Sequence, residues 1–292
     1  MPTTTLSIIL PARNEAATVG AVVAALRGRF PTAEIVVVDD GSADDTGALA
    51  RAAGAHVIRH PVSLGNGAAI KTGARGARGD VLAFMDADGQ HDPEDVVRLI
   101  QKLDEGYDLV VGARSGSTQA SRVRWFGNAI YNRLAGWIVG HPVADLTSGL
   151  RVARAAKFRE FLHLLPNGFS YPTTSTMCFF RAGYGVAYVP IEARQRADKA
   201  SSHIRIVRDG ARFLLIIFRI GTLYSPLKLF TPVALALFLG GLGYSAWTLA
   251  TAGRFTNFGA LMFVTSLLVF FMGLISEQVT QLLYAQRSSA RD

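Results

Sequence analysis

Residues 81–95 read VLAFMDADGQHDPED. An apolar run of this length, bounded by polar residues, is typical of a buried β-strand. Asp86 and Asp88 follow the run directly, although an unpaired carboxylate is costly to bury. The segment is therefore either a solvated turn or a place where carboxylates hold a cation. Asp92 and Pro93 then predict the start of a helix, since aspartate is a favoured N-cap and proline suits the first helical position.

Apolar runs alternate with helical patterns through the first 112 residues of the chain. Strands are predicted at residues 6–10, 34–40, 56–60, 81–85 and 108–112, and helices at 16–26, at 67–77, after 44–46 and from 92–93. Continuous apolar strands that alternate with helices predict an α/β fold, with a mainly parallel sheet covered on both faces. The first strand is not followed by Gly-x-Gly-x-x-Gly, and no Gly-Lys-Ser/Thr phosphate loop occurs, so a dinucleotide-binding fold is not favoured.

Polar residues gather where the predicted strands end, at residues 11–15, 39–40, 86–90 and 112–114. Ligands of such sheets bind at the carboxyl ends of the strands. Alternate residues of an extended segment point the same way, so Asp86 and Asp88 can face one ion. Oxygen ligands suit Mg²⁺ or Mn²⁺, which keep waters and share their shell with substrate phosphates. Gln90 offers a further oxygen, and His91 offers a nitrogen that suits Mn²⁺.

The C-terminal part of the chain contains two runs without a charged residue, at 229–253 and 255–276. About 20 apolar residues span a bilayer as a helix. The two runs predict a transmembrane hairpin, and a hairpin buried in a soluble core is the alternative. Basic residues flank the hairpin, whereas its link contains only Arg254. The positive-inside rule therefore predicts both ends of the hairpin on the cytoplasmic side, as a multi-pass protein of the cell membrane.

Charge is unevenly spread along the chain, whose net charge is +8. Residues 1–112 contain 10 Lys and Arg against 15 Asp and Glu, a balance of −5, and residues 113–292 contain 20 against 7, a balance of +13. Within the basic half, residues 203–224 alternate arginines with apolar residues, as an interfacial amphipathic helix does. Cys178 is the only cysteine, so a disulfide framework is excluded. The N-terminal segment, MPTTTLSIIL, lacks the basic and apolar regions of a signal peptide.

Several motifs together resemble a known family. PARNEA (11–16), VVVDDGSADDT (36–46), LGNGAAIKTG (64–73), MDADGQHDPED (85–95) and VGAR (111–114) resemble the successive motifs of glycosyltransferase family 2, which has the Rossmann-like GT-A fold. RVRWFGNAIYNRLAG (122–136), VADLTSGLRV (143–152) and RADKASSHIRI (196–206) resemble its polyprenyl-phosphate branch, which includes the dolichyl-phosphate mannose and glucose synthases. The resemblance implies a catalytic domain at 1–202, an amphipathic region at 203–226 and two transmembrane helices within 227–292.

The resemblance also implies a role for each matching residue. A nucleotide diphosphate sugar of the GDP-mannose or UDP-glucose type is the expected donor, bound by Pro11, Arg13, Glu15, Val38, Asp39, Asp40, Lys71, Asp86 and Ala87. The expected metal is Mg²⁺ or Mn²⁺ on Asp86, Asp88 and Gln90. A polyprenyl phosphate is the expected acceptor, bound by Arg114, Arg124, Asn128, Arg196 and His203, and the expected catalytic residues are Asp88, Asp145 and Arg114. Asn128 and His203 replace the serine and lysine that relatives commonly have.

Asp145 is expected to orient other groups rather than to remove a proton. The second pKa of a phosphate monoester is about 6, so the acceptor is already largely an anion at neutral pH. A strong base is therefore unnecessary, and Asp145 is expected to hold an arginine or a sugar hydroxyl. Arg151, in the same motif, is a candidate partner for it.

Together with the predicted hairpin, the resemblance implies a membrane-bound inverting hexosyltransferase that acts at the cytoplasmic face. Three alternatives remain open at this stage: a family 2 transferase with a diacylglycerol acceptor, one that extends a polysaccharide, and a non-catalytic membrane scaffold with the same fold. A hydroxyl acceptor would need a true base, and a processive synthase would need more than two membrane spans. The GLGYS segment at 241–245 offers small residues for a homo-oligomer contact. No nucleic-acid partner is expected.

Overall fold

The structure is a computed structural model that describes residues 5–114, 122–168, 171–192, 218, 221, 222 and 225–288, with side chains left undescribed at 122–130 and 283–288. These residues form two compact units, divided within helix α5 (Arg122–Val139) after Leu134. The first unit contains the sheet and the second contains the C-terminal helices. Each unit is described by itself.

The first unit is built on a seven-stranded sheet with the order β3-β2-β1-β4-β6-β5-β7. Its strands are β1 (Leu6–Ala12), β2 (Glu34–Asp39), β3 (His56–Arg59), β4 (Val81–Phe84), β5 (Leu109–Arg114), β6 (Arg151–Arg154) and β7 (Val186–Ile191). All neighbouring strands run parallel except β6, which lies antiparallel between β4 and β5. The predicted mainly parallel α/β sheet is confirmed, including the five predicted strands, whereas β6 and β7 were not predicted.

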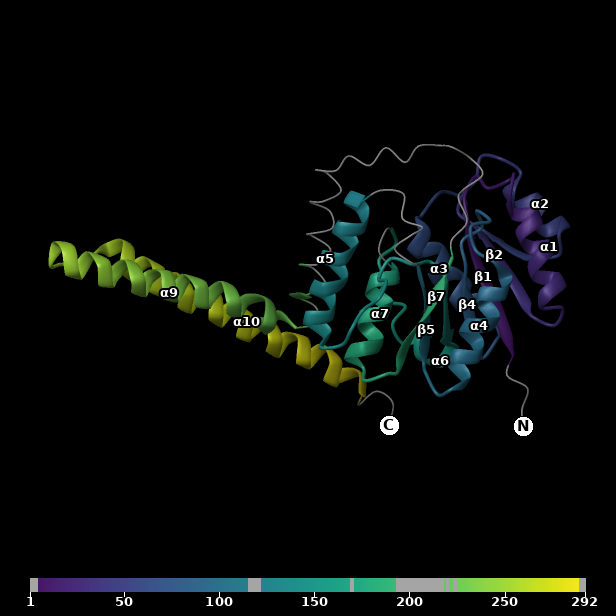
Figure 1. Ribbon diagram of the computed structural model, residues 1–292. Helices are drawn as coiled ribbons and strands as arrows, with labels where there is room; N and C mark the ends of the chain where they lie inside the picture. Colours follow the sequence, from purple (N-terminus) through teal and green to yellow (C-terminus); the bar gives the residue numbers. More distant parts are fainter. Residues whose placement is uncertain are drawn as a thin grey trace. The chain divides into compact units, whose positions relative to one another are not determined.

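Helices cover both faces of the sheet (Figure 1). They are α1 (Val19–Arg29), α2 (Thr46–Ala52), α3 (Asn66–Gly76), α4 (Pro93–Asp104), α6 (Ala155–Arg159) and α7 (Tyr171–Arg181). The apolar residues of α1 and α4 form one core with alternate strand residues such as Ile8 and Ala83. Ile9 and Phe84 point to the opposite face, where Ile9 meets α3 and the ring of Phe84 lies 4.4 Å from that of Phe158 in α6. Because the core occupies the two faces of the sheet, the polar residues that follow the strands can gather at the carboxyl ends of the strands.

The second unit contains a helical hairpin of α9 (Pro226–Ala252) and α10 (Asn257–Ser288), which run side by side in Figure 1. Residues 226–252 and 257–282 are long and apolar enough to cross a membrane, with mean hydropathies of 1.6 and 2.4. Only 17% of each apolar window is buried inside the protein, which does not fit the alternative of a soluble buried hairpin. Gly253 ends α9 in a left-handed conformation, with φ of 63°, as a glycine C-cap does.

Small residues bring the two helices of the hairpin close together. A Cβ on Gly241 would lie 3.0 Å from Met262, and one on Gly259 would lie 2.3 Å from Ser245 Oγ. The Ser266 hydroxyl donates to the carbonyl of Ala234 across the pair. Gly241 and Ser245 of the GLGYS segment thus pack inside the hairpin, while the predicted oligomer stays a prediction. The predicted amphipathic helix at 203–226 lies mostly outside the described residues, and the predicted domain bounds also stay a prediction.

Candidate active site

The loop after β1 is clamped to the loop after β2. Asn14 has a left-handed backbone with φ of 55°, which is uncommon for a residue other than glycine. Its N–H donates to Ser42 Oγ at 3.0 Å, and its Oδ1 accepts from the N–H of Ala43 at 2.9 Å. The N–H of Glu15 donates to Thr46 Oγ1 at 2.8 Å. These bonds fix the predicted donor-binding loop and leave the side chain of Arg13 exposed.

The carboxylate of Asp40 accepts four hydrogen bonds although the residue is only 4% exposed. The donors are His60 Nδ1 at 2.7 Å, Ser63 Oγ at 2.8 Å, and the N–H groups of Leu64 at 2.8 Å and Gly65 at 2.9 Å. A carboxylate has about four acceptor positions, so these donors saturate it. A direct contact of the Asp40 carboxylate with a nucleotide requires one of these bonds to be exchanged, and that predicted contact stays a prediction.

We expect Asp40→Asn to lower stability at neutral pH. Burial by itself raises the pKa of Asp40, but the four hydrogen bonds outweigh it and lower the pKa to about 2. Because the folded pKa lies below the unfolded value of 3.8, this stabilisation is present above pH ~4 and is lost as the pH falls toward 2. The shift corresponds to about 2 kcal/mol. Thermal unfolding of the purified protein should show the deficit at pH 7 and a shrinking one below pH 4, with the exposed Asp104→Asn as control.

Other predicted donor contacts have structural partners. The side chains of Val38 and Asp39 are both 0% exposed, and Asp39 Oδ1 accepts from the N–H of Ser42 at 2.9 Å. Lys71 Nζ donates to the carbonyl of Leu165 at 3.1 Å and also to the Asn167 side chain. Lys71 therefore ties α3 to the segment that follows α6. Val38 and Asp39 are therefore buried as whole residues, whereas Pro11 and Glu15 are partly exposed at the same edge.

The predicted acidic strand end is held against the β1 loop. The Thr18 hydroxyl donates to the carbonyl of Ala87 at 2.9 Å, which joins the ends of β1 and β4. Asp88 Oδ1 accepts from the N–H of Gln90 at 3.1 Å, in a turn that includes Gly89 with φ of 74°. The structure thus brings the predicted donor and metal residues to one edge of the sheet.

The carboxylate of Asp86 is placed as a cation ligand would be. Burial raises the pKa of Asp86, and repulsion from Asp88 adds to the rise, while His91, Arg114 and Arg151 oppose it. Asp86 as a whole is partly exposed, whereas its carboxyl group is buried in the protein. His91 is 8% exposed, and its Nδ1 has no hydrogen-bond partner. A buried carboxylate beside a second one, with an unpaired nitrogen nearby, fits a divalent cation.

Within the described residues, no cluster of three or more His, Cys, Asp or Glu side chains is arranged to hold a metal. Asp86 and Asp88 therefore supply at most a partial coordination shell. Such a shell suits Mg²⁺ or Mn²⁺, because these ions retain waters and bind substrate phosphates as further ligands. The metal site predicted on Asp86, Asp88 and Gln90 is compatible with this arrangement and stays a prediction.

Gly149 makes room for the Asp86 carboxylate. A Cβ at Gly149 would lie 2.4 Å from Asp86 Oδ2, which is closer than atoms approach, so Gly149→Ala must displace the carboxylate. We expect this variant to bind Mn²⁺ at least tenfold more weakly, by isothermal calorimetry with a nucleoside diphosphate, while it remains folded. Gly28→Ala, where a Cβ meets nothing within 4 Å, is the control. Unchanged Mn²⁺ binding in Gly149→Ala would remove Asp86 from the metal site.

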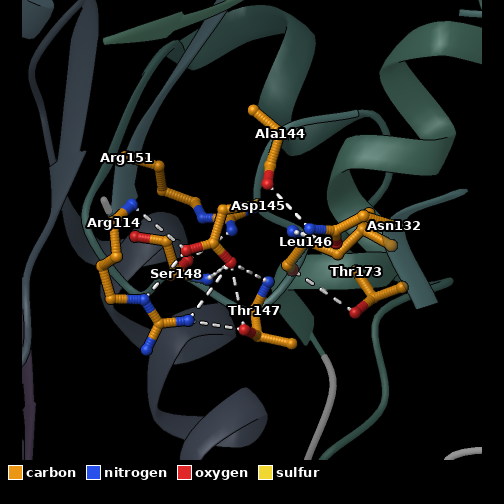
Figure 2. Close-up of polar contacts among 9 residues, drawn as sticks. All are labelled: Arg114, Asn132, Ala144, Asp145, Leu146, Thr147, Ser148, Arg151 and Thr173. Atoms are coloured by element: carbon orange, nitrogen blue, oxygen red, sulfur yellow. Dashed lines mark hydrogen bonds and ion pairs between the residues drawn. The ribbon is translucent and has the colours of Figure 1, made fainter. Parts of the chain in front are cut away.

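Asp145 and Arg114 form a bidentate ion pair (Figure 2). Arg114 Nε donates to Asp145 Oδ2 at 2.8 Å, and Nη2 donates to Oδ1 at 3.2 Å and to Thr147 Oγ1 at 2.6 Å. Asp145 Oδ1 also accepts from the N–H groups of Thr147 at 2.9 Å and Ser148 at 3.1 Å. The turn at residues 145–149 therefore holds the guanidinium of Arg114 in one orientation.

The environment of Asp145 opposes a role as a general base. Burial tends to raise the pKa of Asp145, but the hydrogen bond and charge of Arg114 prevail and lower it below its usual value. A carboxylate with a lowered pKa is a weak proton acceptor at neutral pH. The geometry therefore suits Asp145 to orient Arg114, and the predicted role of Asp145 stays a prediction. The suggested pairing of Arg151 with Asp145 is not what the structure has, since the guanidinium of Arg151 donates to Ser148, Pro172, Ser175 and Thr176.

The structure does not describe every predicted acceptor residue. Arg124 and Asn128 belong to α5, but their side chains are not described, and Arg196 and His203 lie outside the described residues. Sequence reasoning overlooked Thr18, His60, Thr147 and Gly149, which hold the predicted site residues in place. Of these, Thr147 and Gly149 lie within the quoted motif VADLTSGLRV, which is a signal that could have been used.

Two family descriptions match the chain. Residues 7–162 match glycosyl transferase family 2, and residues 225–282 match the GtrB C-terminal hairpin. The first match covers all but the first residue of β1, continues through β6, and contains Asp40, Asp86, Asp88, Arg114 and Asp145. The second covers α9 and most of α10.

Several named proteins are similar to the chain. Glycosyltransferase AglJ of Haloferax volcanii is 30% identical over 252 residues, which are 85% of this chain and 82% of that protein. Polyprenol monophosphomannose synthase of Mycolicibacterium smegmatis is 32% identical over 216 residues, covering 67% and 79%. The crystal structure of glucosyl-3-phosphoglycerate synthase from Mycobacterium tuberculosis with Mn²⁺, UDP and glucosyl-3-phosphoglycerate has a TM-score of 0.59 at 26% identity, covering 73% and 80%.

Proposed function

Because the chain belongs to glycosyltransferase family 2, we propose that it transfers a hexose from a nucleotide diphosphate sugar to a polyprenyl phosphate at the cytoplasmic face of a membrane. The observation that carries this proposal is the joint presence of the family 2 domain and a GtrB-type hairpin in one chain. The named activity of the polyprenol monophosphomannose synthase and of an undecaprenyl-phosphate mannosyltransferase from Micrococcus luteus, 32% identical over 206 residues, supports it.

The donor binds at the carboxyl ends of β1, β2 and β4. The clamped loop with Arg13 and Glu15 faces the nucleotide, and Asp86, Asp88 and Gln90 hold Mg²⁺ or Mn²⁺. When bound, the cation stabilises the negative charge that grows on the departing nucleoside diphosphate. Mn²⁺ and UDP in the similar glucosyl-3-phosphoglycerate synthase structure support a divalent cation.

The acceptor phosphate binds to Arg114. Among the described residues, the hydrogen bonds of the Arg114 side chain use Nε and Nη2, so Nη1 remains for a phosphate oxygen. The side chain is 31% exposed, which leaves it accessible to a ligand. A phosphate oxygen forms the new bond to C1 of the sugar while the bond from C1 to the nucleoside diphosphate breaks. Since the phosphate is already an anion, no proton has to be removed, and attack opposite the leaving group inverts C1.

The membrane hairpin keeps the enzyme where its lipid acceptor lies. Basic residues such as Lys228 and Arg287 flank the hairpin, and Arg254 alone marks its link, so the positive-inside rule orients both flanks to the cytoplasm. Nucleotide sugars are polar and reach the site from the aqueous side. A cysteine is introduced at position 254 or at position 290, and intact cells are treated with a membrane-impermeant thiol reagent. We expect the cysteine at 254 to react and the cysteine at 290 to be protected, and the opposite result would reverse the orientation.

The proposal is tested with detergent-purified protein and radiolabelled UDP- and GDP-sugars with Mn²⁺. Polyprenyl phosphate and diacylglycerol are supplied in separate reactions, and the anomer of the product is determined. We expect labelled polyprenyl-phosphate sugar with an inverted anomeric centre and no product with diacylglycerol. Transfer to diacylglycerol alone would replace the proposed acceptor. Metal-independent nucleotide binding without transfer would favour the non-catalytic scaffold.

A further inference from the structure

Arg151 is a fully buried arginine at the centre of the first unit. It begins β6, where it pairs with Phe84 at the end of β4 and with Val111 in β5. Its exposed fraction is 0%, and it is one of the largest side chains buried to that degree. Position 151 thus lies beside Phe84, two residues before Asp86, and beside Val111, three residues before Arg114 at the end of β5.

The charge of Arg151 is buried without a carboxylate in direct contact. Among the residues that the structure describes, no Asp or Glu lies within 4.0 Å of its guanidinium, and Nε has no hydrogen-bond partner. Burial lowers the pKa of Arg151, and the carboxylates that oppose this effect from a distance are Asp145 and Asp86. An arginine in such surroundings is expensive for stability, which is unusual for a residue with a packing role alone.

Arg151 connects helix α7 to the turn that holds Arg114. Its Nη2 donates to the carbonyl of Ser148 at 2.5 Å, and its Nη1 donates to the carbonyl of Pro172 at 2.8 Å and to Ser175 Oγ at 2.7 Å. The guanidinium also lies 5.5 Å from the ring centre of Tyr171. One planar group therefore connects the turn to the start of α7.

The turn has functional groups on both sides. Through Asp145 it orients Arg114, and through Gly149 it packs against the carboxylate of Asp86. A shift of the 145–149 backbone would therefore move the arginine on the acceptor side and the carboxylate on the donor side together. Displacements of about 1 Å are enough to cost a large part of the rate when two reactants must be aligned.

We propose that Arg151 is a positioning residue that locks the 145–149 turn, and so sets the acceptor-binding Arg114 in register with the donor-side Asp86. This inference rests on the proposed function for the identity of the two substrates. It assigns to Arg151 no contact with either substrate. A lysine cannot replace it, because one ammonium group cannot reproduce the planar, two-ended hydrogen bonding to the turn and to the helix.

The test compares Arg151→Lys, Ser175→Ala and the control Arg154→Lys. Ser175→Ala removes one acceptor of Arg151 at a buried position without changing any charge. Arg154 lies at the other end of β6 and donates to the carbonyl of Leu103 at 3.3 Å, away from the site. We expect kcat for transfer to polyprenyl phosphate to fall ~30-fold in Arg151→Lys and ~3-fold in Ser175→Ala, with Arg154→Lys within twofold of the parent.

A double-mutant cycle separates positioning from general destabilisation. If Arg151 acts through the turn on Arg114, the double variant Arg151→Lys/Arg114→Lys loses much less activity than the product of the two single losses. A second cycle combines Ser175→Ala with Arg114→Lys. If the losses of activity multiply in both cycles, the inference is overturned.

A second readout does not depend on the acceptor. Amide hydrogen exchange of the peptide covering residues 143–152 should be at least tenfold faster in Arg151→Lys than in the parent and in Arg154→Lys. Unchanged exchange overturns the inference even if the parent enzyme is active. Absence of transfer in the parent enzyme, together with faster exchange in Arg151→Lys, would instead reject the proposed function and retain the locking role.

Discussion

Asp86→Ala and Asp88→Ala are each expected to lower the rate of sugar transfer about a thousandfold, which is the size of effect seen when one group that stabilises charge in the transition state is removed. Both carboxylates follow β4 directly, and Asp86 is buried against Gly149. The measurement is kcat with saturating donor, acceptor and Mn²⁺. The exposed Asp104→Ala, at the end of α4, is the matched control.

Stability and activity should separate at Asp86. Burial and the nearby charge of Asp88 disfavour its ionised form, so Asp86→Asn removes an unfavourable charge without a loss of volume. We expect its thermal midpoint without metal to equal or exceed that of the parent, while the stabilisation by Mn²⁺ with a nucleoside diphosphate is lost. Retained stabilisation by Mn²⁺ in Asp86→Asn would place the cation elsewhere.

Arg114→Lys is expected to lower kcat/KM for polyprenyl phosphate about a hundredfold. A lysine ammonium cannot bond both oxygens of Asp145 and Thr147 Oγ1 while it also reaches a phosphate, as the guanidinium can. Binding of the nucleotide with Mn²⁺ should change less than threefold, because the proposed role of Arg114 is to bind the acceptor. If nucleotide binding weakened as much as kcat/KM for polyprenyl phosphate fell, Arg114 would instead bind the diphosphate of the donor.

Asp145→Asn provides the matched comparison for Arg114→Lys. The variant keeps the shape of the side chain and one oxygen for Arg114, so we expect about a tenfold loss, smaller than that of Asp86→Ala or Asp88→Ala. The pH profile should be unchanged in shape, because the proposed mechanism assigns no proton transfer to Asp145. If Asp145→Asn lowered the transfer rate as much as Asp86→Ala does, Asp145 would be supported as a general base. A general base would in turn support an acceptor with a hydroxyl group.

The local pattern of the sequence was sufficient for the scaffold. The sequence predicted five strands, the helices between them and the two membrane-capable helices. Each of these elements is marked by a continuous run or a regular spacing of apolar residues within a short segment of the chain. The placement of the acidic pair at a sheet edge followed from the same reasoning, since parallel strands bring their carboxyl ends together. The resemblance to glycosyltransferase family 2 used motifs that lie at these same ends, and the family was confirmed.

Tertiary structure decided how the predicted residues are used. β6 is four residues long and has an arginine at each end, so its pattern could not indicate that it inserts antiparallel between β4 and β5. That insertion brings Gly149 to Asp86 and buries Arg151. The sequence alone could not distinguish this buried arginine from the other basic residues near it.

By itself, then, the sequence determined the α/β sheet, the hairpin and the type of chemistry, because apolar periodicity and short motifs are local properties. The tertiary structure alone decided that Asp40 is saturated by four donors from residues 60–65, and that Asp145 holds Arg114 rather than pairing with Arg151. The physical reason is that a hydrogen-bonded carboxylate finds its partners across the fold, at distances along the chain that no local pattern encodes.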